Sequence, residues 1–162
     1  IIYNMIKTGI GYDVHQLAES EKLTLGGVEI PSKVGAVGHS DGDALIHSIV
    51  DALLGAANLG DIGQFFPSED DQWKDADSLH FLNIAGEKVR GAGFKINHID
   101  SIIVIQKPKL SGFIPEIKYK IAYTLQIDES SVSVKATTTD HLGYIGEGKG
   151  IAAQAIATIT TG

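Results

Sequence analysis

The chain has 162 residues, of which 43% are hydrophobic and 20% charged, an ordinary mixture for one globular domain. Its net charge of −7 argues against a nucleic-acid-binding protein, because neutralising phosphates requires clustered lysine and arginine. It has no cysteine, so any metal must be held by histidine or oxygen ligands, and no apolar run reaches the roughly 18 residues of a membrane-spanning helix.

Hydrophobic periodicity predicts the secondary structure. In chain order we expect a strand over 6–14, a hairpin over 23–30, helices over 43–58 and 76–91, a strand over 96–106, a helix over 113–125, and strands over 132–137 and 150–160. Residues 35–38 and 60–75 are predicted to be loops. The alanine-rich part of the last strand, 152–157, would also tolerate a helix.

This order of elements favours an α/β (α+β) fold, in which helices pack on a mixed sheet within one domain over 1–162. Ser40 or Asp41 is the expected N-cap of the helix over 43–58, because both residue types cap helices well.

Asp13, His15 and His47 are the strongest candidates for a functional site. Asp13 and His15 stand at i and i+2, so on a strand both side chains project from the same face. The predicted helix can bring His47 to them as a third ligand. Two imidazoles and one carboxylate with an open fourth position are typical of a catalytic zinc site, and the alternative is two structural histidines beside a turn aspartate.

Each of three residues near this triad can have either a structural or a functional role. Asp51 stands at i+4 from His47, where it either orients the imidazole or is a solvated helix residue. Ser40 is explained as a helix cap, but the free N–H groups of a helix start also suit a phosphate, to which His39 can donate.

Two further segments are candidates for ligand binding. The run 135–140 (KATTTD) leaves a strand with three hydroxyls and a carboxylate, which suits a hydrated Mg²⁺ as well as an ordinary strand end. The run 105–111 (IQKPKLS) is either an exposed connection or a rigid loop whose backbone reads a base.

Together these segments resemble the 2-C-methyl-D-erythritol 2,4-cyclodiphosphate synthase family of the non-mevalonate isoprenoid pathway. The matching segments follow the family's order and spacing over nearly the whole chain: GYDVHQL at 11–17, GHSDGDALIHSIVDALLGAANLGDIGQFFP at 38–67, ADS at 76–78, KPKL at 107–110, IPEI at 114–117, VKATTTD at 134–140 and GIAA at 150–153. The long block at 38–67 is highly specific.

The resemblance implies a phosphorus–oxygen lyase. Such an enzyme converts 4-diphosphocytidyl-2-C-methyl-D-erythritol 2-phosphate into the cyclic diphosphate and CMP, with the substrate's own 2-phosphate as nucleophile. It also implies that Asp13, His15 and His47 bind Zn²⁺. Asp140, which stands where the family usually has Glu, would bind a second divalent cation (Mg²⁺ or Mn²⁺), although its shorter side chain reaches less far.

The resemblance also assigns roles to other residues. His39 and Thr138 would be catalytic, His39 with Ser40 at the methylerythritol phosphate and Thr138 on the diphosphate side. Asp61 and Gly63 would contact the ribose. The remaining substrate-binding positions are Phe66, Pro67, Ser68, Glu69 and Asp70 in a flexible loop, Ile105, Gln106, Lys107, Pro108, Lys109, Leu110, Ser111, Ala136 and Thr137 around cytosine, and Thr139, Asp140 and Tyr144, with Asp13 and His15 themselves.

As members of this family do, the chain would form a homotrimer with active sites between subunits and a four-stranded mixed sheet with helices on one side. The expected location is the bacterial cytoplasm, or a plastid-type organelle after removal of a transit peptide. One departure is visible: the family commonly has Gly-Arg-Gly-Glu-Gly where this chain has Gly146-Glu147-Gly148-Lys149-Gly150. In some members that arginine helps bind an isoprenoid diphosphate on the trimer axis, and Glu147 would repel such an anion.

Two alternatives remain from the sequence. A zinc-dependent phosphoesterase would use the same ligands but attack with a metal-bound water. A catalytically silent, metal-stabilised trimer would bind zinc and never release CMP.

Overall fold

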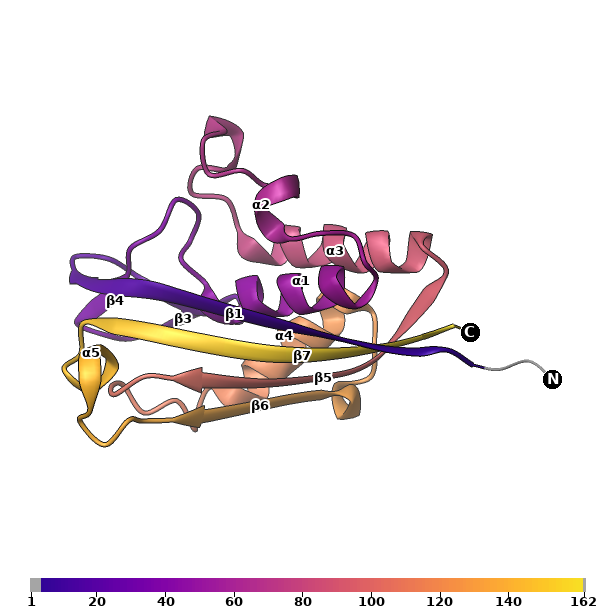
Figure 1. Cartoon of the computed structure of the whole chain (residues 1–162). Coiled ribbons are helices and arrows are strands. Elements are labelled where there is room, and N and C mark those ends of the chain that lie inside the picture. Colours follow the sequence, from indigo (N-terminus) through magenta and orange to yellow (C-terminus); the bar gives the residue numbers. More distant parts are fainter. Residues whose placement is uncertain (1–3, 162) are drawn as a thin grey trace.

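The computed structural model describes residues 4–161. It shows a curved sheet of five strands with helices on one side (Figure 1). The order across the sheet is β4-β1-β7-β5-β6. The strands are β1 (Ile6–Glu19), β4 (Val34–Ala36), β5 (Phe94–Val104), β6 (Val132–Thr137) and β7 (Gly150–Thr161). Residues 1–3 and 162 of the expected domain lie outside the described part.

Three longer helices pack against the sheet: α1 (Ala44–Ala56), α3 (Ser78–Gly91) and α4 (Ile114–Leu125). α1 lies directly on β1 and β7, and its apolar residues are almost fully buried. The smaller elements are the hairpin of β2 (Leu23–Leu25) and β3 (Val28–Ile30), the short helices α2 (Ile62–Phe65) and α5 (Gly143–Gly146), and the 3₁₀ turns Asp71–Trp73 and Glu129–Ser131.

The sheet is mixed, as expected. β7 is antiparallel to both β1 and β5, while β5 and β6 are parallel. The alanine-rich segment 152–157 is a strand within β7 and not a helix.

The expected number of strands, four, is wrong. β4 pairs antiparallel with the end of β1 and adds a fifth strand, although residues 35–38 were predicted to be a loop. Three residues are too short to show a period-2 pattern. Gly35 also permits a very close approach, because a Cβ there would lie 2.2 Å from the backbone carbonyl carbon of Lys22.

The N-cap of α1 is Asp43, so the expectation of Ser40 or Asp41 is also wrong. The Asp43 carboxylate accepts the Ile46 N–H at 3.0 Å, but it also accepts the N–H groups of Gly26 and Gly27 at 3.0 and 2.7 Å. Burial, with the neighbouring carboxylate of Asp41, raises the pKa of Asp43 to about 6, while the three backbone donors favour its charged form. Asp43 therefore anchors the start of α1 to the β2–β3 hairpin.

Two glycines of β1 let α1 approach the sheet closely. A Cβ on Gly9 would lie 2.0 Å from the Ala52 carbonyl oxygen, and one on Gly11 would lie 1.8 Å from that of Ser48. Real side chains do not make such contacts, so both positions require glycine. Gly11 shares a strand face with Asp13, and this close packing fixes the distance between β1 and the helix that carries His47.

We therefore expect Gly11→Ala to destabilise the protein by about 3 kcal/mol or more, because the methyl group meets helix backbone and not a flexible side chain. Gly55→Ala is the matched control: nothing lies within 4 Å of its added Cβ, and alanine favours the helix by about 1 kcal/mol. Urea unfolding at one fixed protein concentration measures both. Equal stability of the two variants would contradict the close-packing argument.

The face of the sheet opposite the helices carries exposed apolar side chains. They are Ile6, Ile10, Tyr12 and Val14 of β1 and Ile156 of β7. Ile10 and Ile156 are direct cross-strand partners, and Tyr12 and Val14 follow Ile10 on the same side of β1. This exposed apolar surface is called here the open face. Among the helices of residues 4–161, none has the length and apolar character needed to span a membrane.

Candidate metal centre

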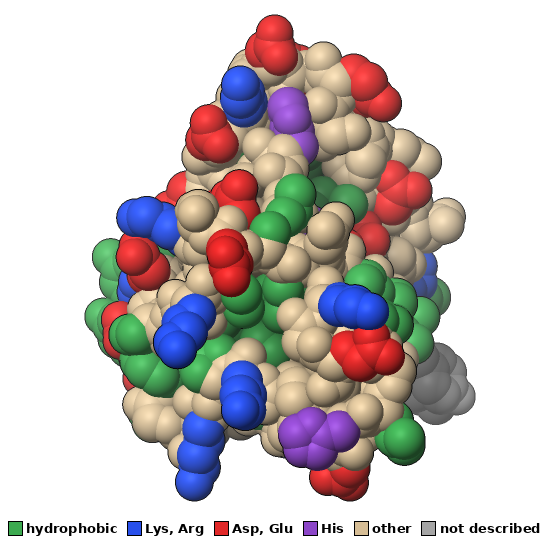
Figure 2. Space-filling model, turned by 90° about the vertical axis from the view of Figure 1, so that its left-hand side faces the viewer, with side chains coloured by type: hydrophobic (Ala, Val, Ile, Leu, Met, Phe, Trp, Pro, Cys, Tyr) green, Lys and Arg blue, Asp and Glu red, His purple; other side chains and the backbone are tan. Residues whose placement is uncertain are grey.

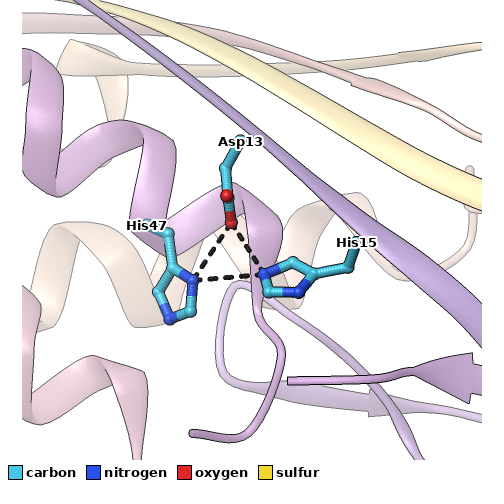
Figure 3. A group of neighbouring side chains, drawn as sticks. All are labelled: Asp13, His15 and His47. Atoms are coloured by element: carbon cyan, nitrogen blue, oxygen red, sulfur yellow. Dashed lines mark hydrogen bonds and ion pairs between the residues drawn. The ribbon is translucent and has the colours of Figure 1, made fainter. Parts of the chain in front are cut away.

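Asp13 and His15, in the second half of β1, converge with His47 in the first turn of α1 (Figure 3). His15 Nε2 lies 2.8 Å from Asp13 Oδ2, and His47 Nδ1 lies 3.1 Å from the same oxygen. The two nitrogens are 3.4 Å apart. The structure thus brings together the three side chains that the sequence predicted as one site.

These distances suit a single metal ion. At tetrahedral bond lengths of about 2.0–2.1 Å, the ligand atoms of one zinc lie about 3.3 Å apart. The three atoms of the triad, 2.8, 3.1 and 3.4 Å apart, are already close to that spacing. Nitrogen and carboxylate donors in this number suit a divalent transition metal and leave a position for an exogenous ligand.

A backbone carbonyl sets the orientation of the His15 ring. His15 Nδ1 lies 2.9 Å from the Val37 carbonyl oxygen, which can only accept, so Nδ1 carries the proton. In the neutral imidazole the lone pair is then on Nε2, the atom that faces Asp13 and His47. This arrangement is typical of metal-binding histidines.

The charges of the triad favour a cation bound between its three side chains. Burial would raise the pKa of Asp13, but its bonds to His15 and His47 outweigh burial and lower the pKa to about 2. Burial would lower the pKa of His15, but the bond to Asp13 and its charge raise that pKa overall. A carboxylate that stays ionised beside two imidazoles is a suitable site for a divalent cation.

The other ring nitrogen of His47 has partners that the sequence analysis missed. His47 Nε2 lies 2.8 Å from Ser78 Oγ and 3.1 Å from Ser40 Oγ. Asp51, proposed as a residue that orients His47 or as a solvated one, does neither: it is half-buried and its carboxylate accepts the Ile62 N–H at 2.7 Å. Asp51 therefore anchors the start of α2 to α1.

A hollow of about 280 Å³ opens beside the triad. Its lining includes these predicted site residues: His15, His39, Ser40, His47, Gly63, Phe66 and Ser68. Ile62, Trp73 and Phe81 also line it and were missed. The sequence did offer one signal, since Trp73 is the single tryptophan of the chain and lies in an otherwise polar loop.

The segment over 66–75 is held above this hollow by aromatic packing and by His39. The Phe66 ring stacks on Phe81 at 4.3 Å between centroids and meets Trp73 edge-on at 5.1 Å. His39 Nε2 lies 3.3 Å from the Asp70 carbonyl oxygen. Pro67 and Glu69 belong to the same segment but do not line the hollow. The predicted loop over 60–75 is therefore not structureless, because 62–65 and 71–73 are short helices.

A second hollow, of about 500 Å³, lies at the end of β5 and β6. Apart from Ile114, its lining is the predicted cytosine-binding set with Thr138: Ile105, Gln106, Lys107, Pro108, Lys109, Leu110, Ser111, Ala136, Thr137 and Thr138. No residue lines both this hollow and the one beside the triad.

Besides Asp13 and the loop residues Pro67, Glu69 and Asp70, four more predicted residues line neither hollow. Asp61 caps α2 through a bond from the Gln64 N–H at 3.0 Å, directly before Ile62 and Gly63. Thr139 Oγ1 donates to the Leu142 carbonyl at 2.7 Å, and exposed Asp140 accepts from Thr138 Oγ1 at 3.4 Å. Tyr144, on α5, packs over Gly150.

Figure 2 shows apolar side chains in the middle of one end of the molecule, with basic and acidic side chains around them. A hollow of about 710 Å³ at the loop 106–109 is lined by three lysines, Lys33, Lys107 and Lys109, and by one carboxylate, that of Glu147. Nearby, Glu147 and Lys149 form an exposed ion pair of 2.5 Å. The chain therefore has an ion pair between positions 147 and 149, with its charges reversed relative to the Gly-Arg-Gly-Glu-Gly pattern.

A family model described as the YgbB family matches residues 6–160, almost the whole chain. The chain belongs to the YgbB family. Curated members named 2-C-methyl-D-erythritol 2,4-cyclodiphosphate synthase are close relatives. One from Desulforamulus reducens is 49% identical over 97% of this chain and all of its own length, and one from Chlorobium phaeobacteroides is 51% identical over 95% and 97%.

Solved YgbB-type structures share the fold. The bifunctional IspDF of Campylobacter jejuni is 44% identical to this chain, with a TM-score of 0.95. The match covers 99% of this chain and 43% of that larger protein. IspF of Plasmodium falciparum, solved as a CDP complex, is 39% identical, with a TM-score of 0.85 over 99% of both chains. The resemblance seen in the sequence is thereby confirmed.

Proposed function

We propose that this chain is a phosphorus–oxygen lyase that converts 4-diphosphocytidyl-2-C-methyl-D-erythritol 2-phosphate into 2-C-methyl-D-erythritol 2,4-cyclodiphosphate and CMP, in non-mevalonate isoprenoid biosynthesis. The observation that carries the proposal is the Asp13–His15–His47 triad, present in a chain about half identical, along nearly its whole length, to synthases of that name. Its bacterial relatives support the bacterial cytoplasm as its location.

The reaction needs no enzyme nucleophile. An oxygen of the substrate's 2-phosphate forms a bond to the β-phosphorus, the bond from that phosphorus to the oxygen shared with the α-phosphate breaks, and CMP leaves with the electron pair. The protein has to position the two phosphates and stabilise the charge that develops. Zn²⁺ held by Asp13, His15 and His47 would supply Lewis-acid polarisation of the β-phosphate.

The hollow beside the triad suits the methylerythritol phosphate. His39 and Ser40 present a ring nitrogen and a hydroxyl there, and the Phe66–Asp70 segment covers it. Asp61 and Gly63, at the start of α2, are the proposed ribose contacts. Aromatic side chains around the hollow exclude water and strengthen polar contacts to the substrate.

The second hollow suits the cytidine half of the substrate. The backbone of 105–111, with Ala136 and Thr137, would read cytosine, while Thr138 would act on the diphosphate. Thr139 and Tyr144 are neighbouring substrate contacts in this proposal. Asp140, exposed at the end of this segment, would bind the second divalent cation (Mg²⁺ or Mn²⁺), which would supply positive charge to the diphosphate.

We further propose a homotrimer in which each active site combines the metal triad of one subunit with the cytidine hollow of the next. The absence of a shared lining residue between the two hollows supports this arrangement. The open face supports it as well, because its apolar residues would be covered in an assembly.

A CMP-release assay with the cytidine-linked substrate tests the proposed function. We expect CMP and the cyclic diphosphate in equal amounts, and loss of both when a chelator removes the metal. A linear phosphate product would favour the zinc-dependent phosphoesterase. Zinc binding that raises the melting temperature while no CMP appears would favour the catalytically silent trimer.

Thr138→Ala should slow turnover by about 10²-fold, because it removes a hydroxyl that would stabilise the transition state. The zinc content should not change, since Thr138 lies in the second hollow and not at the triad. Metal analysis and CMP release measure the two effects, with Thr124→Ala on α4 as the control. Loss of zinc from Thr138→Ala would refute this separation of roles.

The reversed charges at 146–150 lead to a further prediction. We expect weak or no binding of an isoprenoid diphosphate on the trimer axis, because the Glu147 carboxylate repels the anion and is paired with Lys149. Titration calorimetry of the purified protein with farnesyl diphosphate measures this affinity. Micromolar binding would show the prediction to be wrong.

A further inference from the structure

The imidazole of His47 is held from both sides. Its Nδ1 faces Asp13 and His15, while its Nε2 points away from the triad (Figure 3). On that far side, Ser78 Oγ lies 2.8 Å from Nε2. Ser78 is the first residue of α3 and is completely buried, so water does not compete for this bond.

Both donors of Ser78 are directed at one carboxylate. Its backbone N–H donates to Asp41 Oδ2 at 2.9 Å, and its hydroxyl donates to Asp41 Oδ1. A carboxylate can only accept, so the single hydroxyl proton of Ser78 is committed to Asp41. The lone pairs of Ser78 Oγ are then left to accept the Nε2–H of His47.

This chain of donors favours the tautomer of His47 that can bind a metal, in which the ion takes the place of a proton shared between Nδ1 and Asp13. A neutral imidazole with its proton on Nε2 has its lone pair on Nδ1, which is the atom that faces the metal centre. The Asp41 carboxylate thus helps to hold the ring in place through the Ser78 hydroxyl, and such partners of a ligating histidine are known to support metal binding. Ser40 Oγ, at 3.1 Å from Nε2, is the more distant and weaker acceptor for the same His47 N–H.

We propose that Asp41 and Ser78 are positioning residues for the metal: they hold His47 in the Nε2–H tautomer and orient its Nδ1 toward Asp13 and His15. The inference rests on the proposed metal site and adds two residues to it. It also separates the two serines near His47, because Ser78 fixes the ring and leaves the Ser40 hydroxyl for the substrate phosphate.

Asp41 also accepts the Asp43 N–H at 3.1 Å, so it helps to shape the loop before α1. A purely structural role therefore has to be tested separately. Ser78→Ala removes only the hydroxyl and keeps the backbone bond to Asp41. Ser101→Ala is the matched control: Ser101 is also buried, and its hydroxyl donates to the Ser133 carbonyl on the neighbouring strand, away from the triad.

Zinc affinity, measured by competition with a chromogenic chelator, is the primary test. We expect Ser78→Ala to bind zinc about 10–100-fold more weakly than the unaltered chain, and Ser101→Ala to bind it equally well. Ser78→Thr, which restores a hydroxyl, should recover part of the loss. Melting temperatures of the metal-free proteins, which a merely structural role would lower, should be similar for the two alanine variants.

Nuclear magnetic resonance of the zinc-loaded, ¹⁵N-labelled protein gives a second measurement. We expect a slowly exchanging Nε2–H proton on His47 that shifts or exchanges rapidly in Ser78→Ala. If Ser78→Ala does not fold, the near-isosteric Asp41→Asn takes its place, with the same expected direction. Unchanged zinc affinity in a folded Ser78→Ala or Asp41→Asn protein would overturn this inference alone, whereas absence of zinc binding by the unaltered chain would overturn the metal site itself.

Discussion

We expect His47→Ala to lose metal binding at the triad and to lower CMP release by at least about 10²–10³-fold. His47 supplies one of only three protein ligands, and its ring is the sole member of the triad on α1. The two ligands that remain are both on β1, so the ion would be bound from one side only. Metal analysis of the dialysed protein and the CMP-release assay measure the two losses.

The fold should survive this change. His47 lies at the edge of the core, with 12% of its side chain exposed, and Gly9 and Gly11 keep α1 against the sheet without it. Circular dichroism should therefore remain unchanged. His98→Ala, on β5, removes another partly buried imidazole away from the triad and should retain both metal and turnover. Full CMP release by a metal-free His47→Ala protein would refute the proposed role of the metal.

The triad could be predicted because its geometry follows from local periodicity. Alternation along a strand places Asp13 and His15 on one face whatever the rest of the fold is. The helical pattern around His47 is equally local, and the glycines that bring α1 close to β1 lie on the same face as Asp13. The signal for the metal site therefore does not depend on the two- or three-residue error in the predicted N-cap of α1.

The contacts of Asp41, Ser78 and Asp51 could not be predicted from local pattern. Ser78 meets Asp41 across 37 positions and His47 across 31, and both contacts depend on how α3 packs against α1. A period of 3.6 places Asp51 below His47 on α1, but the free N–H at the start of α2 takes its carboxylate. Tertiary packing determines which side chain pairs with the free backbone groups at a helix end. It also determines that the short segment β4 pairs with the edge of the sheet.

Ile10→Glu should dissociate the proposed trimer and lower turnover by more than about 10²-fold. Ile10 is 63% exposed on the open face and pairs across strands with Ile156, so a carboxylate there would be buried without a partner in an assembly. Within one chain the same substitution should be tolerated, because surface changes usually cost less than about 0.5 kcal/mol. Zinc binding should therefore remain, since all three ligands come from a single chain.

Light scattering, zinc content and CMP release on the same sample separate assembly from chemistry. Tyr123→Glu is the matched control, because Tyr123 is also a largely exposed apolar residue but lies on helix α4. This substitution should leave all three measurements unchanged. A trimeric and active Ile10→Glu protein would show that the open face is not the interface. A monomer that still releases CMP would show that one chain holds a complete active site, and that the two hollows act together without a second subunit.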